Sequence, residues 1–363
     1  MFLKNVWYVA AWADEIATGL HSTLILGEKI CLFKNSVGVA VAFEDYCPHR
    51  RLPLSMGKLK GDLLECGYHG LTFDCSGQCV GAPANGNKIP DNSNLRTYPC
   101  AERYGLVWIW MGDPDLANTD NIFQVDYFDD PDWGYNRGDA IDVACNYQYI
   151  NDNLLDPTHV AWVHASTFGE ANTKDTPLEV DVSDAGVIVS RWMLNCKPAP
   201  FYKQVITFDG ACDRLQHYEV RYPSLALIRA VFTPAGTGGV EGMLHDDTFI
   251  MNSYNFMTPM DEQNTRYYWF QLRNIKPDDD ALSATMSAGV KSAFEEDRVI
   301  LNAVQQGMNE KLDRFISMRS DVGGFQFRRQ LKKLILDEHT VVEQTVVEQP
   351  MADQTRAEPA TAD

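Results

Sequence analysis

The sequence predicts an α+β protein, in which an all-β N-terminal domain precedes a larger domain built from an antiparallel sheet and helices. Residues 1 to about 118 consist of short β-branched and aromatic runs separated by Gly, Asn and Pro. Strand-like runs recur between about 186 and 274, several with period-two alternation. One long helical pattern, 277–308, follows them. The 363 residues suffice for two such domains.

In the N-terminal domain we expect strands in several turn-bounded runs: "EKICLFKN", "GVAVAFED", "LLECGYHG", "LTFDCSGQCV" and "YGLVWIWM". The stretch "GDPDLANTDNIFQVDYFDDPDW" then becomes acidic and proline-rich, which is typical of a boundary between domains. We therefore predict a first domain over 1–118 and a second over 119–340.

In the second domain, "YQYINDNLLDPTHVAWVHAST" predicts a helix that Pro157 interrupts. Strands are expected in "GVIVSRWML", "LQHYEVRY", "LALIRAVFTP", "DTFIMNSYNFMTP" and "TRYYWFQLRN". The long helix opens with Pro277 and three aspartates, which suit the positive end of a helix dipole. Residues 341–363 are polar and repeat "TVVEQ", so we expect a disordered acidic tail there.

The charge of the chain limits its partners. A net charge of −19 argues against nucleic acid and anionic membrane surfaces, since both require clustered Lys and Arg. No apolar run approaches the roughly 18 residues of a membrane span. The N-terminal run "NVWYVAAW" is followed at once by Asp14 and Glu15, which favours a strand over a signal peptide. Nine scattered cysteines suit a reducing compartment, so we expect a cytoplasmic protein.

A first candidate metal site lies in "CPHRRLPLSMGKLKGDLLECGYHG". Cys47 and His49 form one pair, and Cys66 and His69 form a second pair after sixteen residues. Structural zinc with two Cys and two His is one possibility, but zinc fingers usually pair like with like. Mixed pairs suit a Rieske 2Fe–2S cluster, in which the two irons carry different ligands. Such a cluster relays electrons at a raised reduction potential.

A second candidate metal site lies in "NDNLLDPTHVAWVH", which contains Asp156, His159 and His164. On a straight helix the two histidines would diverge by about 140°, so the helix must kink or bulge for both to reach one ion. Pro157 and a π-type turn supply a means. Two histidines and one carboxylate would form the facial triad of a non-haem Fe(II) site that activates O2.

These motifs make the chain resemble the Rieske non-haem iron oxygenases, over nearly its whole length to about residue 335. The resemblance is nearest to the oxygenase components of vanillate O-demethylase, dicamba monooxygenase and toluenesulfonate methyl-monooxygenase. It rests on "CPHR", "CGYHG", "NVWYVAAWADEI", "ERYGLVWIWMGDP" and the D-x-x-H-x4-H motif. It implies that Asp297, in "FEEDRVILNAV", is the third iron ligand, although Glu295 and Glu296 adjoin it.

The resemblance also implies a reaction and partners. A separate NADH-dependent reductase or ferredoxin would reduce the cluster, and electrons would reach the iron that activates O2 beside an aromatic substrate. The family members are homotrimers in which electrons pass between chains, which would place His69 of one chain against Asp156 of the next. Asp156 and Asn153 are therefore the candidate catalytic residues. For an O-demethylase the methyl carbon is hydroxylated, and formaldehyde and a phenol are released.

The substrate pocket is less defined by the sequence. We expect walls from 225–232, 250–257 and the long helix, with apolar residues such as Leu227, Ile228 and Phe256. Asn255 is a candidate for binding a substrate oxygen, or else a strand residue bonded to backbone. Arg229 could receive a carboxylate, or strand alternation could turn it outward. Hydroxylation of a ring or methyl group, and a Rieske electron-transfer protein, remain alternatives.

Overall fold

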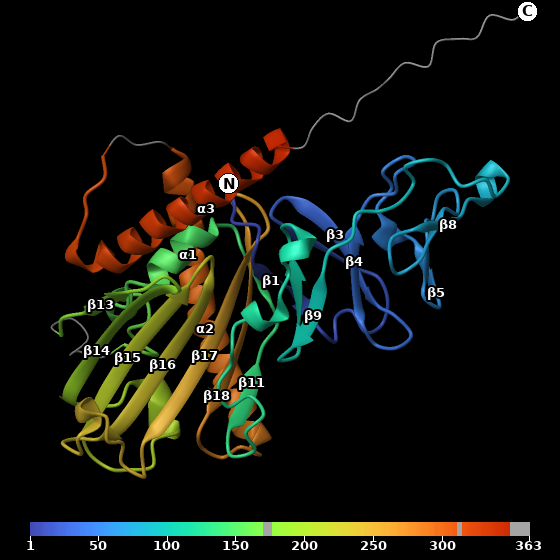
Figure 1. Cartoon of the computed structure of the whole chain (residues 1–363). Coiled ribbons are helices and arrows are strands. Elements are labelled where there is room, and N and C mark those ends of the chain that lie inside the picture. Colours follow the sequence, from blue (N-terminus) through green and yellow to red (C-terminus); the bar gives the residue numbers. More distant parts are fainter. Residues whose placement is uncertain (170–175, 311–313, 349–363) are drawn as a thin grey trace, which may run out of the picture.

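A computed structural model describes residues 1–169, 176–310 and 314–348 of the chain, and the side chains up to residue 340 (Figure 1). An N-terminal domain of small sheets lies beside a larger domain in which one long antiparallel sheet carries three helices. This arrangement confirms the predicted α+β class. No helix in these described ranges is long and apolar enough to cross a membrane.

The N-terminal domain contains three small antiparallel sheets. The first has the order β1-β10-β9, the second β2-β3-β4 and the third β5-β6-β7-β8. Their bounds are β1 Trp7–Trp12, β2 His21–Ile25, β3 Glu28–Lys34, β4 Ala40–Glu44, β5 Lys58–Lys60, β6 Leu63–Glu65, β7 Thr72–Phe73, β8 Cys79–Gly81, β9 Cys100–Arg103 and β10 Leu106–Trp110. The third sheet and its loops carry the first candidate metal motif.

The large sheet has the order β11-β18-β17-β16-β15-β14-β13, and β12 also pairs with β18. All its ladders are antiparallel. The bounds are β11 Gly134–Arg137, β12 Ile141–Val143, β13 Glu179–Val182, β14 Gly186–Cys196, β15 Cys212–Arg221, β16 Leu225–Pro234, β17 Phe249–Pro259 and β18 Thr265–Arg273. Successive side chains of each strand point to opposite faces, so the register decides which residues share a face.

One face of this sheet is covered by helices α1 (Tyr147–Leu154), α2 (Asp280–Asn309) and α3 (Val322–Glu348). Side chains from all three helices join those of β14 to β18 in a single buried core. Asp279 caps α2, and its carboxylate accepts a hydrogen bond from the backbone N–H of Leu282 at 2.8 Å. This capping fits the acidic start expected for the long helix.

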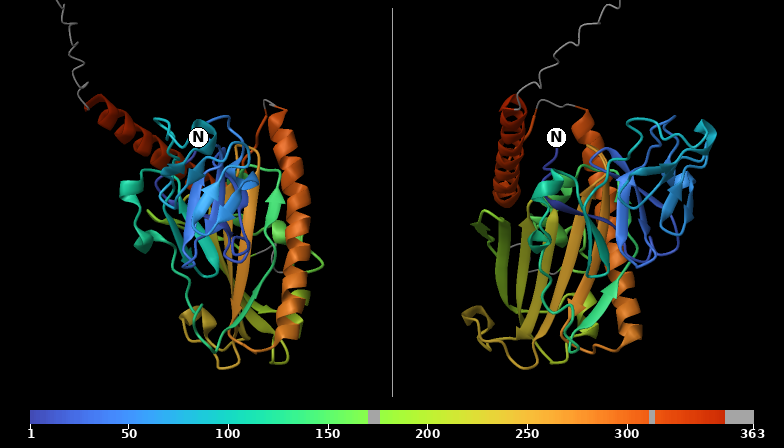
Figure 2. Two further views of the ribbon diagram at one scale, coloured as in Figure 1. Left: turned by 90° about the vertical axis from the view of Figure 1, so that its right-hand side faces the viewer. Right: turned by 45° about the vertical axis from the view of Figure 1, so that its right-hand side comes forward.

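The other face of the sheet packs against β1 and β10 of the N-terminal domain (Figure 2). Trp108 meets Phe256 edge to face, with ring centroids 5.3 Å apart. The Thr258 hydroxyl donates to the carbonyl of Val9 at 2.7 Å, and the Tyr268 hydroxyl donates to that of Ala10 at 2.9 Å. Along β16 to β18 both faces of the sheet are therefore buried, and the two domains share a core.

The C-terminal region differs from the expectation of a tail that is disordered from residue 341. Helix α3 continues to Glu348, so residues 341–348, which include most of the repeated "TVVEQ", are helical. Glu, Gln and Val side chains form no barrier to extending a helix that tertiary packing has already nucleated. Residues 349–363 of the expected tail lie outside the described residues.

Candidate metal centres

Two loops of the third small sheet carry the Cys and His pairs. The loop after β4 contains Cys47 and His49, and the loop between β6 and β7 contains Cys66 and His69. In the first, the Cys47 N–H donates to the carbonyl of Leu52 at 2.9 Å. In the second, the Cys66 N–H donates to the carbonyl of Leu71 at 2.8 Å. Both loops thus fold back on themselves in the same way, five residues after the cysteine.

The four side chains of these loops converge. The imidazole rings of His49 and His69 lie with their centroids 4.5 Å apart, while Cys47 and Cys66 are buried beneath. Burial, with a smaller contribution from the neighbouring Cys66, raises the pKa of the Cys47 thiol to about 11. Such a raised pKa means that paired thiolates here require a cation to stabilise them.

The second feature that fits a metal is at His69. Its Nδ1 atom is buried and has no hydrogen-bond partner among the described residues. A 2Fe–2S cluster held by Cys47, His49, Cys66 and His69 would give this nitrogen its partner. Gly70 allows the loop to turn there, because its φ of +73° lies in the left-handed region.

The second site forms where α2 passes the segment after α1. His159, His164 and Asp297 each offer one ligand atom, and these atoms lie within 4.8 Å of one another. Oδ1 of Asp297 is 3.2 Å from Nε2 of His164 and 3.7 Å from Nε2 of His159. Two imidazoles and one carboxylate on one side of an ion leave open positions opposite, as in the facial triad of Fe(II) oxygenases.

Hydrogen bonds fix the orientation of both imidazoles. Nδ1 of His159 lies 2.6 Å from the carbonyl oxygen of Asp156, which can only accept, so Nδ1 carries the proton. Nδ1 of His164 lies 2.7 Å from the carboxylate of Glu296 and donates to it. Both rings therefore direct Nε2 towards Asp297 and a shared ion.

The electrostatics also favour a bound cation. Burial is the main cause that lowers the pKa of His159, so this ring stays neutral. Burial opposes protonation of His164 as well, but the hydrogen bonds and charges of Asp297 and Glu296 outweigh it and raise its pKa. A cation among these groups would take the place of the His164 proton.

The local backbone brings the two histidines together by a different route from the one expected. The sequence predicts one helix that kinks or bulges, but α1 ends at Leu154 and the chain turns through Asp156 and Pro157. His159 then starts a separate 3₁₀ turn that ends at Ala161. Pro157 disfavours the helical conformation of the residue before it, so the helix ends rather than bends.

The candidate catalytic residues take different positions. The Asp156 carboxylate accepts hydrogen bonds from the backbone N–H of Thr158, at 3.0 Å, and from its hydroxyl. It is thus the backbone carbonyl of Asp156, not its carboxylate, that contacts an imidazole of this chain. Asn153, in the last turn of α1, donates from Nδ2 to Oδ1 of Asp297 at 3.3 Å. Asn153 therefore contacts the side chain of the proposed third ligand.

Three consecutive acidic residues on α2, Glu295 to Asp297, have different partners. Asp297 faces both histidines, and Glu296 contacts only the outer nitrogen of His164. Glu295 pairs with Arg298 on the surface, at 2.6 Å. The geometry therefore favours Asp297 as the third ligand, and the contact of Glu296 with His164 is one that the sequence analysis missed. The adjacency of Glu296 to the proposed ligand was its only signal.

A cavity opens from the three proposed ligands and lies between the sheet and α2. Its lining comes from residues on α1, α2, β15, β16, β17, β18 and the segments after α1 and β14. Apart from the proposed ligands, the lining is mostly aromatic and aliphatic: Leu154, Val160, Phe168, Tyr202, Tyr218, Ile228, Met251, Val290, Ala293 and Phe294. Three further lining residues are polar or charged: Arg214, Ser253 and Gln271. Such a cavity suits an aromatic ring with few polar groups.

All three predicted walls, 225–232, 250–257 and the long helix, contribute to the lining, but of the individually named residues only Ile228 does. Leu227 and Phe256 belong to the core on the opposite face, against the N-terminal domain. Arg229 also points to that face, where Nε donates to Oδ1 of Asn252 at 3.0 Å. One-residue steps along a strand reverse the side-chain direction, and both faces are buried here, so the apolar pattern does not show which face is which.

Asn255 is fully buried and lies outside the cavity lining. Its Nδ2 donates to the carbonyl of Ser253 at 2.9 Å, and its Oδ1 accepts from the Tyr267 hydroxyl at 3.0 Å. The structure thus favours the alternative in which Asn255 is a bonded strand residue, and it contradicts the substrate-binding role. The sequence analysis missed three residues that do line the cavity: Arg214, Tyr218 and Gln271. Polar side chains occur at both odd and even positions of these strands, so the sequence does not show which of them face the cavity.

Comparisons with known proteins match both domains. Residues 6–99 match the Rieske [2Fe-2S] domain, and residues 143–337 match the vanillate O-demethylase oxygenase C-terminal domain. The iron–sulfur subunit TsaM1 of the toluene-4-sulfonate monooxygenase system of Comamonas testosteroni is 40% identical over 93% of this chain and 99% of its own. The vanillate O-demethylase oxygenase subunit of Pseudomonas sp. (strain HR199 / DSM 7063) is 33% identical over 94% and 98%.

A solved structure supports the same assignment. Dicamba monooxygenase bound to 3,6-dichlorosalicylic acid superimposes with a TM-score of 0.86 at 28% identity, over 93% of this chain and 99% of that one. The same enzyme has been solved with non-haem iron and dicamba, and that structure gives a TM-score of 0.77. With both metal motifs placed in matching domains, the chain belongs to the Rieske non-haem iron oxygenases, in the group of monooxygenase and O-demethylase oxygenase components.

Proposed function

We propose that this oxygenase component removes the methyl group of a methoxylated aromatic acid. The observation that carries the proposal is the apolar, ring-lined cavity that opens directly on His159, His164 and Asp297. The methyl C–H is hydroxylated with O2, two electrons and two protons, and one water is released. The hemiacetal product then breaks its C–O bond and yields formaldehyde and a phenol.

The chain's own residues would divide the work in the following way. His159, His164 and Asp297 would hold the iron, which when bound supplies the activation of O2. Asn153 and Glu296 would orient these ligands through the hydrogen bonds described above. Phe168, Tyr202 and their apolar neighbours would hold the aromatic ring and exclude water.

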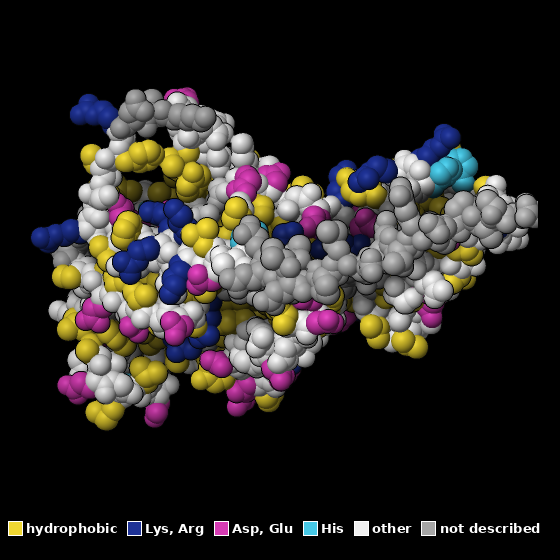
Figure 3. All heavy atoms as spheres, turned by 45° about the horizontal axis from the view of Figure 1, so that its top comes forward, with side chains coloured by type: hydrophobic (Ala, Val, Ile, Leu, Met, Phe, Trp, Pro, Cys, Tyr) yellow, Lys and Arg dark blue, Asp and Glu magenta, His cyan; other side chains and the backbone are white. Residues whose placement is uncertain are grey.

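The electrons would come from NADH through a separate flavin and iron–sulfur reductase or a ferredoxin in the cytoplasm. Figure 3 shows histidine side chains beside Lys and Arg side chains at the end of the N-terminal domain. Arg50, Arg51 and Lys58 are exposed around this end, on a chain whose net charge is −19. A basic rim around the cluster would attract an acidic surface of the electron donor.

We further infer that the active assembly is a homotrimer. Within one chain the sheet of β5 to β8, whose loops carry the cluster ligands, lies at the outer end of the N-terminal domain, away from α1 and α2 (Figure 1). Electron transfer would therefore run from His69 of one chain to Asp156 of the next. The carboxylate of Asp156 has one oxygen on Thr158, which leaves the other oxygen for an imidazole N–H of a neighbouring chain.

A second candidate function, hydroxylation of an aromatic methyl group, is favoured by the relative named for toluene-4-sulfonate. The experiment that separates the two uses the iron-loaded protein with a surrogate reductase, NADH and O2. Methoxylated benzoates should give formaldehyde in step with NADH consumed. If only 4-methyl acids are turned over, and their product is an alcohol, the demethylase proposal is wrong. A content of about two irons per chain, rather than three, would instead indicate an electron-transfer protein.

A further inference from the structure

Arg214 is a buried arginine without a carboxylate partner. It lies on β15, where its side chain is 2% exposed, and it lines the cavity that contains the proposed iron ligands. Its Nη1 donates to the carbonyl of Phe168 at 3.2 Å, while its Nε is buried and has no hydrogen-bond partner. No ion pair joins Arg214 to a carboxylate anywhere in the described ranges.

The nearest acidic residue in sequence does not neutralise this charge. Asp213 points to the opposite face of β15, where its two carboxylate oxygens accept from the N–H groups of Asn195 and Gly236, each at 2.8 Å. The guanidinium instead lies over the rings of Tyr202 and Phe232, with its carbon 5.4 and 5.1 Å from the ring centroids. Two aromatic faces stabilise a cation only in part, so among the described residues Nε is left as a buried donor without a partner and the charge has no carboxylate beside it.

The position of Arg214 relative to the iron ligands is set by the strand register and by a row of rings. Arg214 pairs with Phe232 on β16, and Tyr218, four residues further along β15, pairs with Ile228. Both point to the cavity, about 13 Å apart along the strand. Phe168 bridges the two ends, because its ring centroid lies 6.1 Å from that of His164 and 5.7 Å from that of Tyr202.

From these observations we propose that Arg214 binds the anionic group of the aromatic substrate, a carboxylate or a sulfonate. An arginine presents its donors in a planar fork that matches either oxyanion. With the anion at Arg214 and the ring against Phe168 and Tyr202, the opposite end of the substrate faces His159, His164 and Asp297. This inference rests on the proposed function for the substrate class and the position of the reacting carbon, and it adds the residue that binds the acid group.

The test compares ligands of nearly equal shape and different charge. 4-Methoxybenzoate, 4-methoxybenzenesulfonate and the uncharged 4-methoxybenzamide are titrated calorimetrically into the iron-loaded full chain, without reductant or O2. The wild-type protein should bind at least one anion about 100-fold more tightly than the amide, which is the usual scale for a buried charged hydrogen-bonded pair. Of the two anions, the one that binds more tightly identifies the natural headgroup.

Variants then assign this preference to Arg214. Arg214→Met should lower anion affinity about 100-fold and change amide affinity less than about threefold. Arg214→Lys keeps the charge without the fork, so the preference should persist with anion affinity about tenfold weaker. The matched control is Arg229→Met, on the neighbouring strand and the opposite face, which should leave all three affinities unchanged. Cluster absorbance and iron content verify that each variant is folded.

Two outcomes would overturn the proposal. One is a wild-type protein that binds amide and anions equally. The other is an Arg214→Met variant that loses amide and anion affinity in equal measure, since this would make Arg214 a wall of the cavity only. If Arg214→Met does not fold, the wild-type comparison and Arg214→Lys still decide. Anion preference without any formaldehyde in turnover would refute demethylation alone, and formaldehyde from the amide at the rate of the benzoate would refute the anion site alone.

Discussion

At the scale of single residues, Glu296 shows how a neighbour of a ligand can act through that ligand. Its carboxylate accepts from Nδ1 of His164 at 2.7 Å and so holds Nε2 towards the ion. We predict that Glu296→Gln weakens iron binding about 10- to 100-fold, because such partners fix the orientation and basicity of a metal-binding imidazole. The measurement is iron retained per chain in a series of chelator concentrations.

Glu295→Gln is the matched control for this prediction. It makes the same chemical change one residue earlier on α2, where the carboxylate pairs with Arg298 on the surface. Iron retention in this variant should equal that of the wild-type protein, since an exposed pair contributes little. Equal iron loss in both variants would mean that the charge of α2, and not the contact with His164, holds the metal.

His159 gives a second prediction for one residue. His159→Ala removes one of three proposed ligands, together with the hydrogen bond from Nδ1 to the carbonyl of Asp156. Iron should fall from about three to about two atoms per chain, because the Rieske site lies in another domain. The visible spectrum of the cluster should not change. Loss of cluster absorbance together with the iron would show a folding defect and would contradict the assignment of His159 as a ligand.

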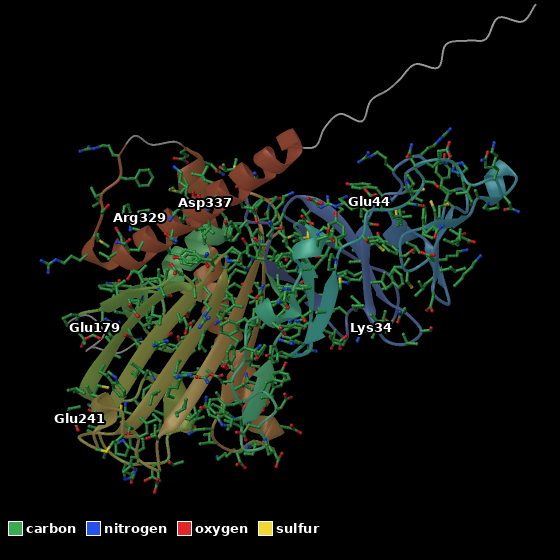
Figure 4. All side chains as sticks on the ribbon, viewed as in Figure 1. Lys34, Glu44, Glu179, Glu241, Arg329 and Asp337 are labelled. Atoms are coloured by element: carbon green, nitrogen blue, oxygen red, sulfur yellow. The ribbon has the colours of Figure 1, made fainter. Side chains whose placement is uncertain are left out.

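At the scale of secondary-structure elements, α3 shows how a helix far from the metals supports the site. Its buried side chains recur with helical spacing, at Phe327, Leu331 and Ile335. Arg329 and Asp337, labelled in Figure 4, lie on its exposed side. The buried face packs on α1 and β14, and α1 supplies Asn153 to Asp297. The stability of α3 is thus linked to the geometry of the ligands.

The expected cost of breaking this packing is large. Phe327 is fully buried and stacks on Tyr222 with ring centroids 4.7 Å apart. We predict that Phe327→Ala lowers the free energy of unfolding by about 3–5 kcal/mol, because it leaves a cavity in a close-packed core. Phe325→Ala, on the same helix but at a 56% exposed position, should cost less than about 0.5 kcal/mol. Chemical denaturation of both variants checks the difference, and equal effects would show that α3 is not packed as described.

At the scale of the whole molecule, the two metal sites require a route for electrons. The proposed route uses Asp156, which sits at the turn after α1 with its carboxylate partly bound to Thr158. Asp156→Asn retains the size of the side chain and its hydrogen bond from the Thr158 N–H, and it removes the negative charge. We predict that a cluster reduced with dithionite is then reoxidised much more slowly by O2 and substrate, while iron content, assembly and cluster spectrum persist.

The measurement for Asp156→Asn is a single turnover, followed by cluster absorbance and by product. Product formed at the wild-type rate would rule out the proposed route. Thr158→Val is a useful comparison, because it removes only the hydroxyl that donates to Asp156. It tests whether the orientation of the carboxylate matters separately from its charge. Loss of iron in Asp156→Asn would instead indicate that Asp156 acts as a ligand.

The sequence by itself determined the features that depend on neighbours along the chain. Cys47, His49, Cys66 and His69 could be read from two short loops, because the spacing within a loop fixes which side chains meet. His159 and His164 were recognised for the same reason, although the turn that unites them was expected to be a kinked helix. The α+β class followed from periodicity, which both the strands and α2 display.

Only the tertiary structure decided which residues from distant elements meet. It placed Asp297 at the two histidines and Glu296 on an outer nitrogen, although both lie on one helix in the same local context. It put Arg214, rather than Arg229, in the cavity. The physical reason is that both faces of β16 to β18 are buried, one by helices and one by the N-terminal domain. Alternation along a strand defines two sets of side chains, but only the packing partner of each face determines which set surrounds the metal.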